Sequence, residues 1–227
     1  MLTERGEQGL HLVGVDESGD RRFELVRAAD GKTRDQDPAI SPDGRWVVFA
    51  SSRGRGFSET SLWIAPVQPD AIATPLTRGT WIDAHPTWRP DASGIVFDST
   101  RTGGEYDLYA LAIDRDGRAR GEPHALTSAP GHEVTASVAR DGTIVYAAVH
   151  SLGGGQVESH LELRRPDGTI ERVTDGPGDA TPSFSPDGAT IGFSRPVVRD
   201  GVADAELWTT PRDHGEPTRL VDIKLTD

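Results

Sequence analysis

The sequence predicts an all-β protein built from repeated four-stranded sheets, and three observations support this fold class. A Pro-rich turn sequence recurs four times at intervals of 46 to 50 residues. Each interval contains four short apolar segments bounded by Gly, Pro, Asp and Ser. Among the 227 residues, 26 Gly and 16 Pro accompany only 35% hydrophobic residues, a balance that favours short strands and tight turns over long helices.

The repeat is easiest to follow through its turn aspartates, Asp43, Asp91, Asp141 and Asp187, which are 48, 50 and 46 residues apart. Residues 37–44 form the first copy of the turn region, and residues 85–91, 135–142 and 181–188 form the later ones. A period of about 40–50 residues is typical of the blades of a β-propeller.

The strands of each copy follow from its apolar segments. In the first copy the segments are residues 39–40, 46–49, 62–64 and 75–77. The later copies repeat the last three of them at 95–97, 108–111 and 125–127, at 144–146, 161–163 and 172–174, and at 191–193, 207–208 and 219–221. The segments are short and rich in β-branched and aromatic residues, which predicts strands, and four strands make a blade.

The turn between the first two strands has the sequence Ser-Pro-Asp-Gly at residues 41–44 and again at 185–188. Proline presets φ at the first central position, aspartate tolerates the second, and glycine accepts the positive φ that follows. The turn therefore predicts a β-hairpin with a bulge.

Four blades are thus expected, at about residues 37–84, 85–133, 134–179 and 180–227. Residues 1–36 match the second half of a further blade, with 10–15 as its third strand and 23–26 as its fourth. The sequence predicts one propeller domain of about four full blades plus this N-terminal half blade.

Charge and composition exclude several classes of partner. The 36 acidic and 24 basic residues give a net charge of −12, which repels nucleic acid and favours cations or basic protein surfaces, although solubility alone also explains such a charge. The absence of Cys excludes disulfides and thiolate metal sites. No apolar run reaches the roughly 20 residues of a membrane helix, and the polar N-terminus predicts no secretory signal in the chain as given.

Two motifs make the repeat resemble the TolB-type propeller, which is similar to the WD propellers in its blades. One is the sequence Pro-Ser-Phe-Ser-Pro-Asp-Gly at residues 182–188, and the other is the strand end at residues 49–53 and 97–101, where Phe is followed four residues later by Arg. The resemblance covers residues 37–227. It implies a protein-binding or scaffolding role and a periplasmic or exported location, although such blades also occur in peptidases and a few lyases.

The resemblance also implies that the propeller is partial or open, because TolB-type propellers usually close with six or more blades. An open propeller leaves a sheet edge exposed, and self-association through that edge is then expected.

An acidic residue precedes the anchor position of every repeat by three residues: Asp35, Asp83, Glu133 and Asp179. In a propeller this position lies at the entry to the innermost strand, near one mouth of the central channel. Four carboxylates there would attract a cation, and Ca²⁺, which takes flexible oxygen ligands, is the first candidate. The alternative is local, because Asp also binds backbone NH groups in tight turns.

Two histidines lie beside these carboxylates, His85 and His132. With Asp83 they would make a mixed nitrogen and oxygen site suited to Mn or Zn. The alternative is that both are solvated loop residues.

Three further residues are candidates for a ligand or partner. Trp81 lies in a loop rather than on a strand, and its ring is suited to stacking. Arg53 and Arg101 follow the second strand in two repeats, where they either bind an acidic partner group or pair with acidic neighbours.

The sequence therefore favours a non-catalytic binding or scaffold module for protein–protein interaction. Two alternatives stay open: a metal-dependent propeller lyase acting on an acidic oligosaccharide, and the propeller part of a larger peptidase-like protein. No nucleophile elbow, phosphate loop or His-Glu-x-x-His motif is present to assign catalytic residues.

Overall fold

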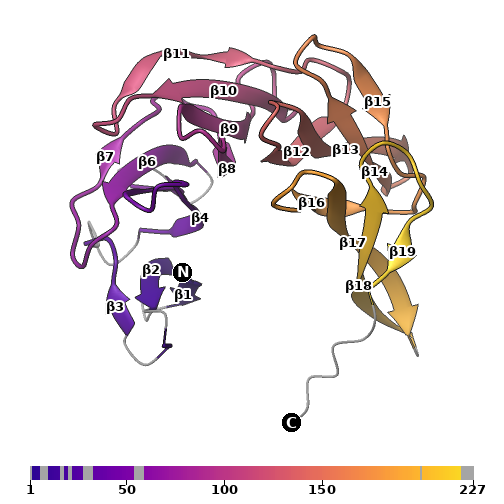
Figure 1. Cartoon of the computed structure of the whole chain (residues 1–227), viewed down its shortest axis with the longest axis horizontal. Helices are drawn as coiled ribbons and strands as arrows, with labels where there is room; N and C mark the ends of the chain where they lie inside the picture. Colours follow the sequence, from indigo (N-terminus) through magenta and orange to yellow (C-terminus); the bar gives the residue numbers. More distant parts are fainter. Residues whose placement is uncertain are drawn as a thin grey trace. The chain divides into compact units, whose positions relative to one another are not determined.

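All regular elements in the described part of the chain are β-strands, as the sequence predicts (Figure 1). The computed structural model describes residues 2–5, 10–15, 18–19, 22–27, 33–53, 59–199 and 201–220. Contacts divide the chain into two compact units, residues 1–129 and residues 130–227. In every sheet the strands follow one another in sequence order and pair antiparallel.

The first unit contains one three-stranded and two four-stranded sheets. The three-stranded sheet comprises β1 (Leu2–Arg5), β2 (Leu10–Val15) and β3 (Arg22–Glu24). The next comprises β4 (Asp35–Ile40), β5 (Trp46–Ser51), β6 (Ser61–Pro66) and β7 (Thr74–Pro75). The last comprises β8 (Asp83–Trp88), β9 (Gly94–Ser99), β10 (Asp107–Ile113) and β11 (Ala119–Ala125).

The second unit contains two four-stranded sheets. One comprises β12 (His132–Val138), β13 (Ile144–Gly153), β14 (Gln156–Arg164) and β15 (Ile170–Arg172). The other comprises β16 (Ala180–Phe184), β17 (Thr190–Arg199), β18 (Val202–Pro211) and β19 (Thr218–Arg219). Residues 221–227, which the sequence assigns to the end of the last blade, lie outside the described residues.

The N-terminal sheet has one strand more than the half blade that the sequence predicts. Strand β1 pairs with β2 from Leu2 opposite Val13 to Arg5 opposite Leu10. The segment Leu-Thr-Glu-Arg carries no apolar alternation, so its extended conformation depends on the ladder to β2 rather than on a pattern of its own.

The core of the first unit lies between its sheets. Buried side chains of β5 and β6, such as Val48 and Leu62, pack with Ile95 and Phe97 of β9 and with Tyr109 of β10. A second cluster joins β5 to the N-terminal sheet through Leu12 and Phe49. Burying side chains of this size contributes about 1.5–3 kcal/mol each, so face-to-face packing of successive sheets is the main stabilising contact within the unit.

The predicted turn is built as its sequence requires. The Ser41 hydroxyl donates to Asp43 (2.6 Å), the amide of Trp46 donates to the Ser41 Oγ (2.9 Å), and Gly44 has φ of 72°. The same bonds recur at Ser185 and Asp187. These hydrogen bonds favour the ionised carboxylate and lower the pKa of Asp43 and of Asp187.

In three sheets a threonine side chain accepts a hydrogen bond from a backbone amide of the third strand. The buried amides of Leu62, Leu108 and Leu161 donate to the Oγ1 of Thr77 (2.8 Å), Thr127 (2.8 Å) and Thr174 (3.0 Å). In each of these sheets the outermost strand ends two residues before the threonine, and the threonine hydroxyl takes the place of the backbone carbonyl that a longer strand would supply.

Replacing Thr127 with valine is expected to lower the free energy of unfolding by about 1–3 kcal/mol, because the buried amide of Leu108 loses its acceptor while the side-chain volume is kept. The measurement is urea unfolding at constant slope. Thr127→Ser keeps the hydroxyl and loses only a methyl group, so it should cost less than Thr127→Val. Equal losses for the two variants would show that the hydrogen bond contributes nothing.

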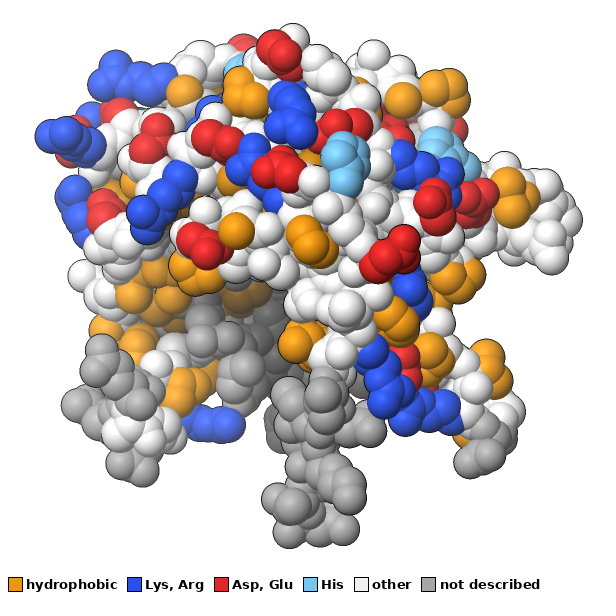
Figure 2. All heavy atoms as spheres, turned by 45° about the vertical axis from the view of Figure 1, so that its right-hand side comes forward, with side chains coloured by type: hydrophobic (Ala, Val, Ile, Leu, Met, Phe, Trp, Pro, Cys, Tyr) orange, Lys and Arg blue, Asp and Glu red, His pale blue; other side chains and the backbone are white. Residues whose placement is uncertain are grey.

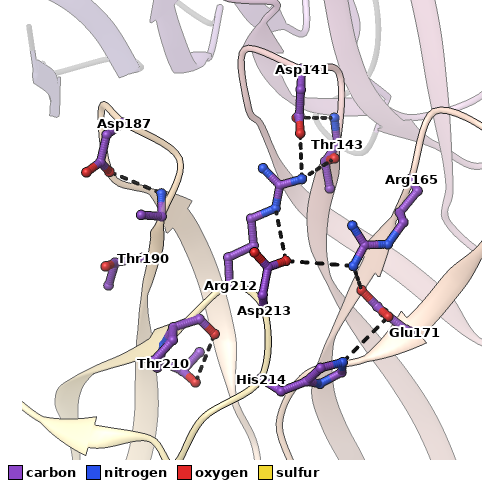
Figure 3. A network of polar contacts seen from close by, with 12 residues as sticks. Asp141, Thr143, Arg165, Glu171, Asp187, Thr190, Thr210, Arg212, Asp213 and His214 are labelled. Carbon is purple, nitrogen blue, oxygen red and sulfur yellow. Dashed lines mark hydrogen bonds and ion pairs between the residues drawn. The ribbon is translucent and has the colours of Figure 1, made fainter.

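Polar contacts join the two blades of the second unit (Figure 3). Arg212, just after β18, donates from Nη2 to Asp141 Oδ2 (2.5 Å) and to Thr143 Oγ1 (2.8 Å) in the turn between β12 and β13. Arg165 pairs with Glu171 and approaches Asp213 to 3.8 Å. The arginine lowers the pKa of Asp141, so this contact strengthens as the carboxylate ionises.

Within the described residues no helix has the length and apolar character that a membrane crossing requires.

Candidate functional site

The first strand of each four-stranded sheet carries a β-bulge at the same place. Two residues of that strand stand opposite a single residue of the second strand. The first residue of each bulge has positive φ without being glycine, and these residues are Asp37 (52°), His85 (44°), Thr135 (55°) and Thr181 (49°). We call these four the bulge residues.

The sequence around the bulge explains part of this geometry. Proline follows Asp37, His85 and Thr181, and it has no N–H to leave unpaired where the ladder is interrupted. A non-glycine residue at positive φ stores about 1–3 kcal/mol of strain, and a β-branched threonine tolerates it least. Strain repeated in four sheets is typical of positions where the direction of a side chain matters.

In the first unit two bulge residues meet. His85 Nδ1 lies 2.9 Å from the Oδ2 of Asp98 on β9, and His85 Nε2 lies 3.9 Å from the Oδ2 of Asp37 on β4. The Asp98 side chain is fully buried, whereas 44% of the His85 side chain and 29% of the Asp37 side chain are exposed. The carboxylate of Asp98 raises the pKa of His85, against the opposing effect of burial.

In the second unit the bulge residues are hydroxylic. Thr181 is exposed, and its Oγ1 lies 2.8 Å from the Oγ of Ser194 on β17. Thr135 is half-buried on β12. The same backbone frame therefore presents a carboxylate, an imidazole and two hydroxyl groups in successive sheets.

Behind the bulges, three sheets hold a buried Asp–Arg pair. Arg101 Nη2 lies 2.8 Å from Asp83 Oδ2, and Arg195 forms a bidentate pair with Asp179 at 2.7 and 2.9 Å. Arg53 pairs with Asp35. Serine hydroxyls add bonds of 2.5 Å to Asp35 and 2.6 Å to Asp83. The three aspartates are at most 2% exposed, so each depends on its arginine for charge compensation.

Aromatic rings lie against the arginines of these pairs. The guanidinium of Arg101 lies 5.2 Å from the ring centres of Trp81, Phe97 and Tyr109, and that of Arg195 lies 4.4 Å from the ring of Trp208. Such contacts stabilise a desolvated cation by about 2 kcal/mol. Trp81, predicted as a ligand-stacking residue, thus covers an arginine in this structure.

The sheet β12–β15 departs from this pattern. Glu133 takes the place of the aspartate and is buried. Tyr146 donates to Glu162 (2.8 Å), His160 lies 3.2 Å from the same carboxylate, and the ring of His150 stacks on that of His160 at 5.5 Å. Burial and the Glu162 carboxylate raise the pKa of Tyr146.

The predicted site residues lie in two kinds of environment. The aspartates and arginines form buried ion pairs, whereas the histidines lie apart from those pairs. Asp35, Asp83 and Asp179 face the arginines of their own sheets, and Arg53 and Arg101 are only 7% and 11% exposed. His85 contacts Asp98 and Asp37, whereas Asp83 is held by Arg101, and His132 lies in the other unit. Within the described residues no group of three or more His, Asp or Glu side chains is arranged to hold a metal ion. Binding of Ca²⁺, Mn or Zn stays a prediction.

Sequence reasoning missed the bulge residues Asp37, Thr135 and Thr181. The one available signal was their shared position directly before the anchor of the repeat. A residue before proline favours extended backbone, so the sequence does not predict positive φ there.

Four-stranded antiparallel sheets in sequence order, repeated along the chain, are the blades of a β-propeller. The family described as the TolB beta propeller domain matches residues 13–205. The chain belongs to this family, as the turn and strand motifs predict.

Two curated relatives match most of the chain. The uncharacterized protein Atu1656 of Agrobacterium fabrum (strain C58) is 26% identical over 215 residues, which are 93% of this chain and 66% of that protein. The uncharacterized peptidase YuxL of Bacillus subtilis (strain 168) is 26% identical over 196 residues, which are 83% of this chain and 28% of the peptidase. The chain spans less than two thirds of the length of either relative.

Solved structures share the fold at low identity. A candidate TolB from Agrobacterium tumefaciens has a TM-score of 0.65 at 21% identity, with 87% of this chain and 68% of that one covered. TolB from Acinetobacter baumannii has a TM-score of 0.63 at 20% identity, with 92% and 50% covered. An oligogalacturonate lyase in complex with manganese has a TM-score of 0.59 at 16% identity, with 80% and 50% covered.

Proposed function

We propose that the chain is a non-catalytic binding module whose bulge residues contact a protein partner. The observation that carries this proposal is a backbone geometry that repeats in four sheets while the side chain at the bulge position changes. The bulge, its positive φ and the aromatic residue opposite it recur in four sheets, while the residue presented changes from Asp to His to Thr. Within each unit, a side chain that varies on a fixed backbone geometry suits recognition of a structured partner.

The buried Asp–Arg pairs support this role because they stabilise the sheets next to the bulge residues. They hold the first and second strands of their sheets together through side chains, next to the bulge. A recognition surface held rigid before binding loses less conformational freedom when the partner docks. The arginines and aspartates then act as positioning residues, and the bulge residues make the contacts.

Charge favours a protein over a polyanion. The net charge is −12, and on the face shown in Figure 2 acidic and basic side chains are interspersed rather than gathered into a basic patch. A nucleic acid would require a continuous basic surface, whereas a protein partner can match such a mixed surface. The TolB and peptidase relatives are compatible with a propeller that binds on its own or as part of a longer protein.

Site-specific crosslinking tests the proposal. A photoreactive amino acid is introduced at the bulge residue Thr181 and, as a control in the same unit, at the exposed turn residue Asp167. In cells of the source organism, the Thr181 variant is expected to give one discrete adduct with a protein, and the Asp167 variant none. Equal adducts from both variants would contradict a partner site at the bulges.

The purified chain, without a photoreactive residue, is tested for catalytic turnover. A lyase acting on an acidic oligosaccharide would produce an unsaturated product that absorbs ultraviolet light, and metal-dependent product formation would replace the binding role with a catalytic one. Under the present proposal no absorbance change occurs with manganese, with calcium or with chelator.

A further inference from the structure

An uncharged row of side chains crosses the last sheet of the second unit: Thr181, Ser194, Leu207 and Leu220. Thr181 Oγ1 lies 2.8 Å from Ser194 Oγ, and Ser194 stands opposite Leu207 in the ladder. The amide of Leu220 donates to the carbonyl of Leu207 at 2.9 Å, and both leucines are more than half exposed. The bulge residue Thr181 is therefore continuous with an apolar sheet face, which we call the outer face of this sheet.

Strands β17 and β18 extend the outer face beyond β16. Their ladder continues to Arg199 opposite Val202, whereas β16 pairs with β17 only as far as Ser194, so the two strands run on together as a ribbon (Figure 1). On the outer face this ribbon carries four exposed residues: Pro196, Val198, Ala203 and Ala205. Charged side chains of the ribbon lie on its opposite face, where Arg199 pairs with Glu206. The outer face thus combines exposure with the absence of ionisable groups.

The equivalent face of the neighbouring sheet is buried by sheet packing. The turn bonds to the carbonyls of Thr143 and Thr190 align the second strands of the two sheets. Four positions then correspond in register: Gly192 to Val145, Ser194 to Ala147, Leu207 to Leu161 and Thr209 to Leu163. In the sheet β12–β15 these four residues are at most 1% exposed and pack with Ile191 and Phe193 of β17. A blade of this chain therefore receives another sheet on this face.

We propose that the outer face binds a second copy of this chain, face to face about a two-fold axis. The inference rests on the proposed function, because it names the protein that contacts Thr181. A face without ionisable groups offers no charge complementarity to a basic protein. It can meet its own copy without placing like charges in contact, although each copy carries a net charge of −12.

The outer face is complementary to itself. Leu207 is a large exposed side chain, and the residues beside it on β17 are the small Gly192 and Ser194. A Cβ added at Gly192 would meet only the carbonyl of Ser183, at 3.9 Å, so the space above Gly192 is open. In a two-fold interface every contact occurs twice, with the roles of the copies exchanged. Leu207 of each copy can therefore fill the space above Gly192 of the other.

The edge of β18 is less suited to association than the face. The amide of Ala205 lies on the same side of β18 as the Leu207 carbonyl that pairs with Leu220, beyond the end of β19. This amide donates to Asp204 Oδ1 at 2.8 Å. An edge amide that already has an acceptor, with a carboxylate beside it, disfavours the addition of a strand. Self-association, predicted at an exposed sheet edge, is then expected at the face instead.

Analytical ultracentrifugation of the purified chain tests the inference. A monomer–dimer equilibrium is expected between about 10 μM and about 1 mM, because the face is small and carries few large apolar side chains. Salt screens the net charge of the copies, so the dimer fraction should rise when NaCl is raised from about 50 to about 500 mM. A chain that stays monomeric at every concentration and salt overturns the inference.

Gly192→Val separates the proposed fit from general apolar attraction. The added side chain fills the space meant for Leu207 of the second copy, while its Cβ has room within its own chain. The Kd of the dimer should rise about tenfold or more, whereas general attraction predicts a lower Kd from the added apolar surface. Urea unfolding of the variant checks that the fold is kept. Association as tight as that of the unchanged chain overturns the inference.

A matched pair of charge substitutions locates the contact. Leu207→Asp places two carboxylates near each other across the axis and should abolish the dimer. Ile72→Asp changes an exposed side chain of the first unit and should leave the Kd unchanged. Equal losses from the two variants overturn the inference.

Crosslinking separates this inference from the proposed function. The purified chain with a photoreactive residue at Thr181 should give, on its own, an adduct of twice the chain mass. If the purified chain stays monomeric while the Thr181 adduct formed in cells contains another protein, the inference fails and the proposed function stands. If Thr181 gives no adduct in either setting, both fail.

Discussion

Replacing Arg101 with alanine should lower the free energy of unfolding by about 3–5 kcal/mol, because Asp83 would be left as an uncompensated buried charge. The Asp83 carboxylate is fully buried, and Arg101 Nη2 approaches its two oxygens to 3.0 and 2.8 Å. The substitution also removes the cation from the faces of three aromatic rings. The quantity to measure is the urea midpoint together with its slope.

The matched control is Arg118→Ala. Arg118 belongs to an ion pair with Asp116 at 3.8 Å, in which both side chains are more than 70% exposed. Solvent screens this pair, so the change should stay within about 0.5 kcal/mol. Adding Asp83→Asn to the Arg101→Ala chain removes the uncompensated charge and should restore part of the loss. Equal effects of Arg101→Ala and Arg118→Ala would refute the structural role of the buried pair.

Replacing Phe97 with alanine should also cost about 3–5 kcal/mol, through the lost transfer free energy and the cavity left behind. Phe97 is fully buried in the cluster between the two four-stranded sheets of the first unit. Its ring lies 6.0 Å from that of Tyr109 and 5.2 Å from the guanidinium of Arg101. The same unfolding measurement applies.

Phe97→Leu keeps most of the volume and should cost less than half as much as Phe97→Ala. Because Phe97 stands opposite the bulge that begins at His85, its removal should also loosen the His85–Asp98 contact. A loss below about 1 kcal/mol for Phe97→Ala would mean that the neighbouring sheet collapses into the space, and that the packing described is not the main stabilising contact.

The strands were predictable because their signal is local and repeated. Segments such as residues 46–49 and 95–97 alternate with turn sequences at a regular interval, and they lie in β5 and β9. Strand β1 was not predictable from its own residues, because Leu-Thr-Glu-Arg has no apolar alternation and becomes a strand only by pairing with β2.

The site was predictable only in part. Acidic residues at positions 35, 83 and 179 were recognised from the sequence, but their arginines lie 16 to 18 residues further along and are joined to them across the ladder. Pairing of that kind depends on register, which an unaligned sequence does not give. The positive φ of His85 is set by the bulge and opposes the preference of a residue before proline.

The buried Asp–Arg pairs also bear on how a chain of blades can lengthen or shorten. In three sheets the carboxylate lies at or directly before the start of the first strand and its cation lies on or just after the second strand of the same blade, not in a neighbouring blade. A duplicated blade therefore brings its own counter-charge, and a deleted blade takes its counter-charge with it. Neither event leaves an unpaired ion in the interior of these sheets. The number of blades can therefore change by whole blades while the buried charges of each remaining pair still balance.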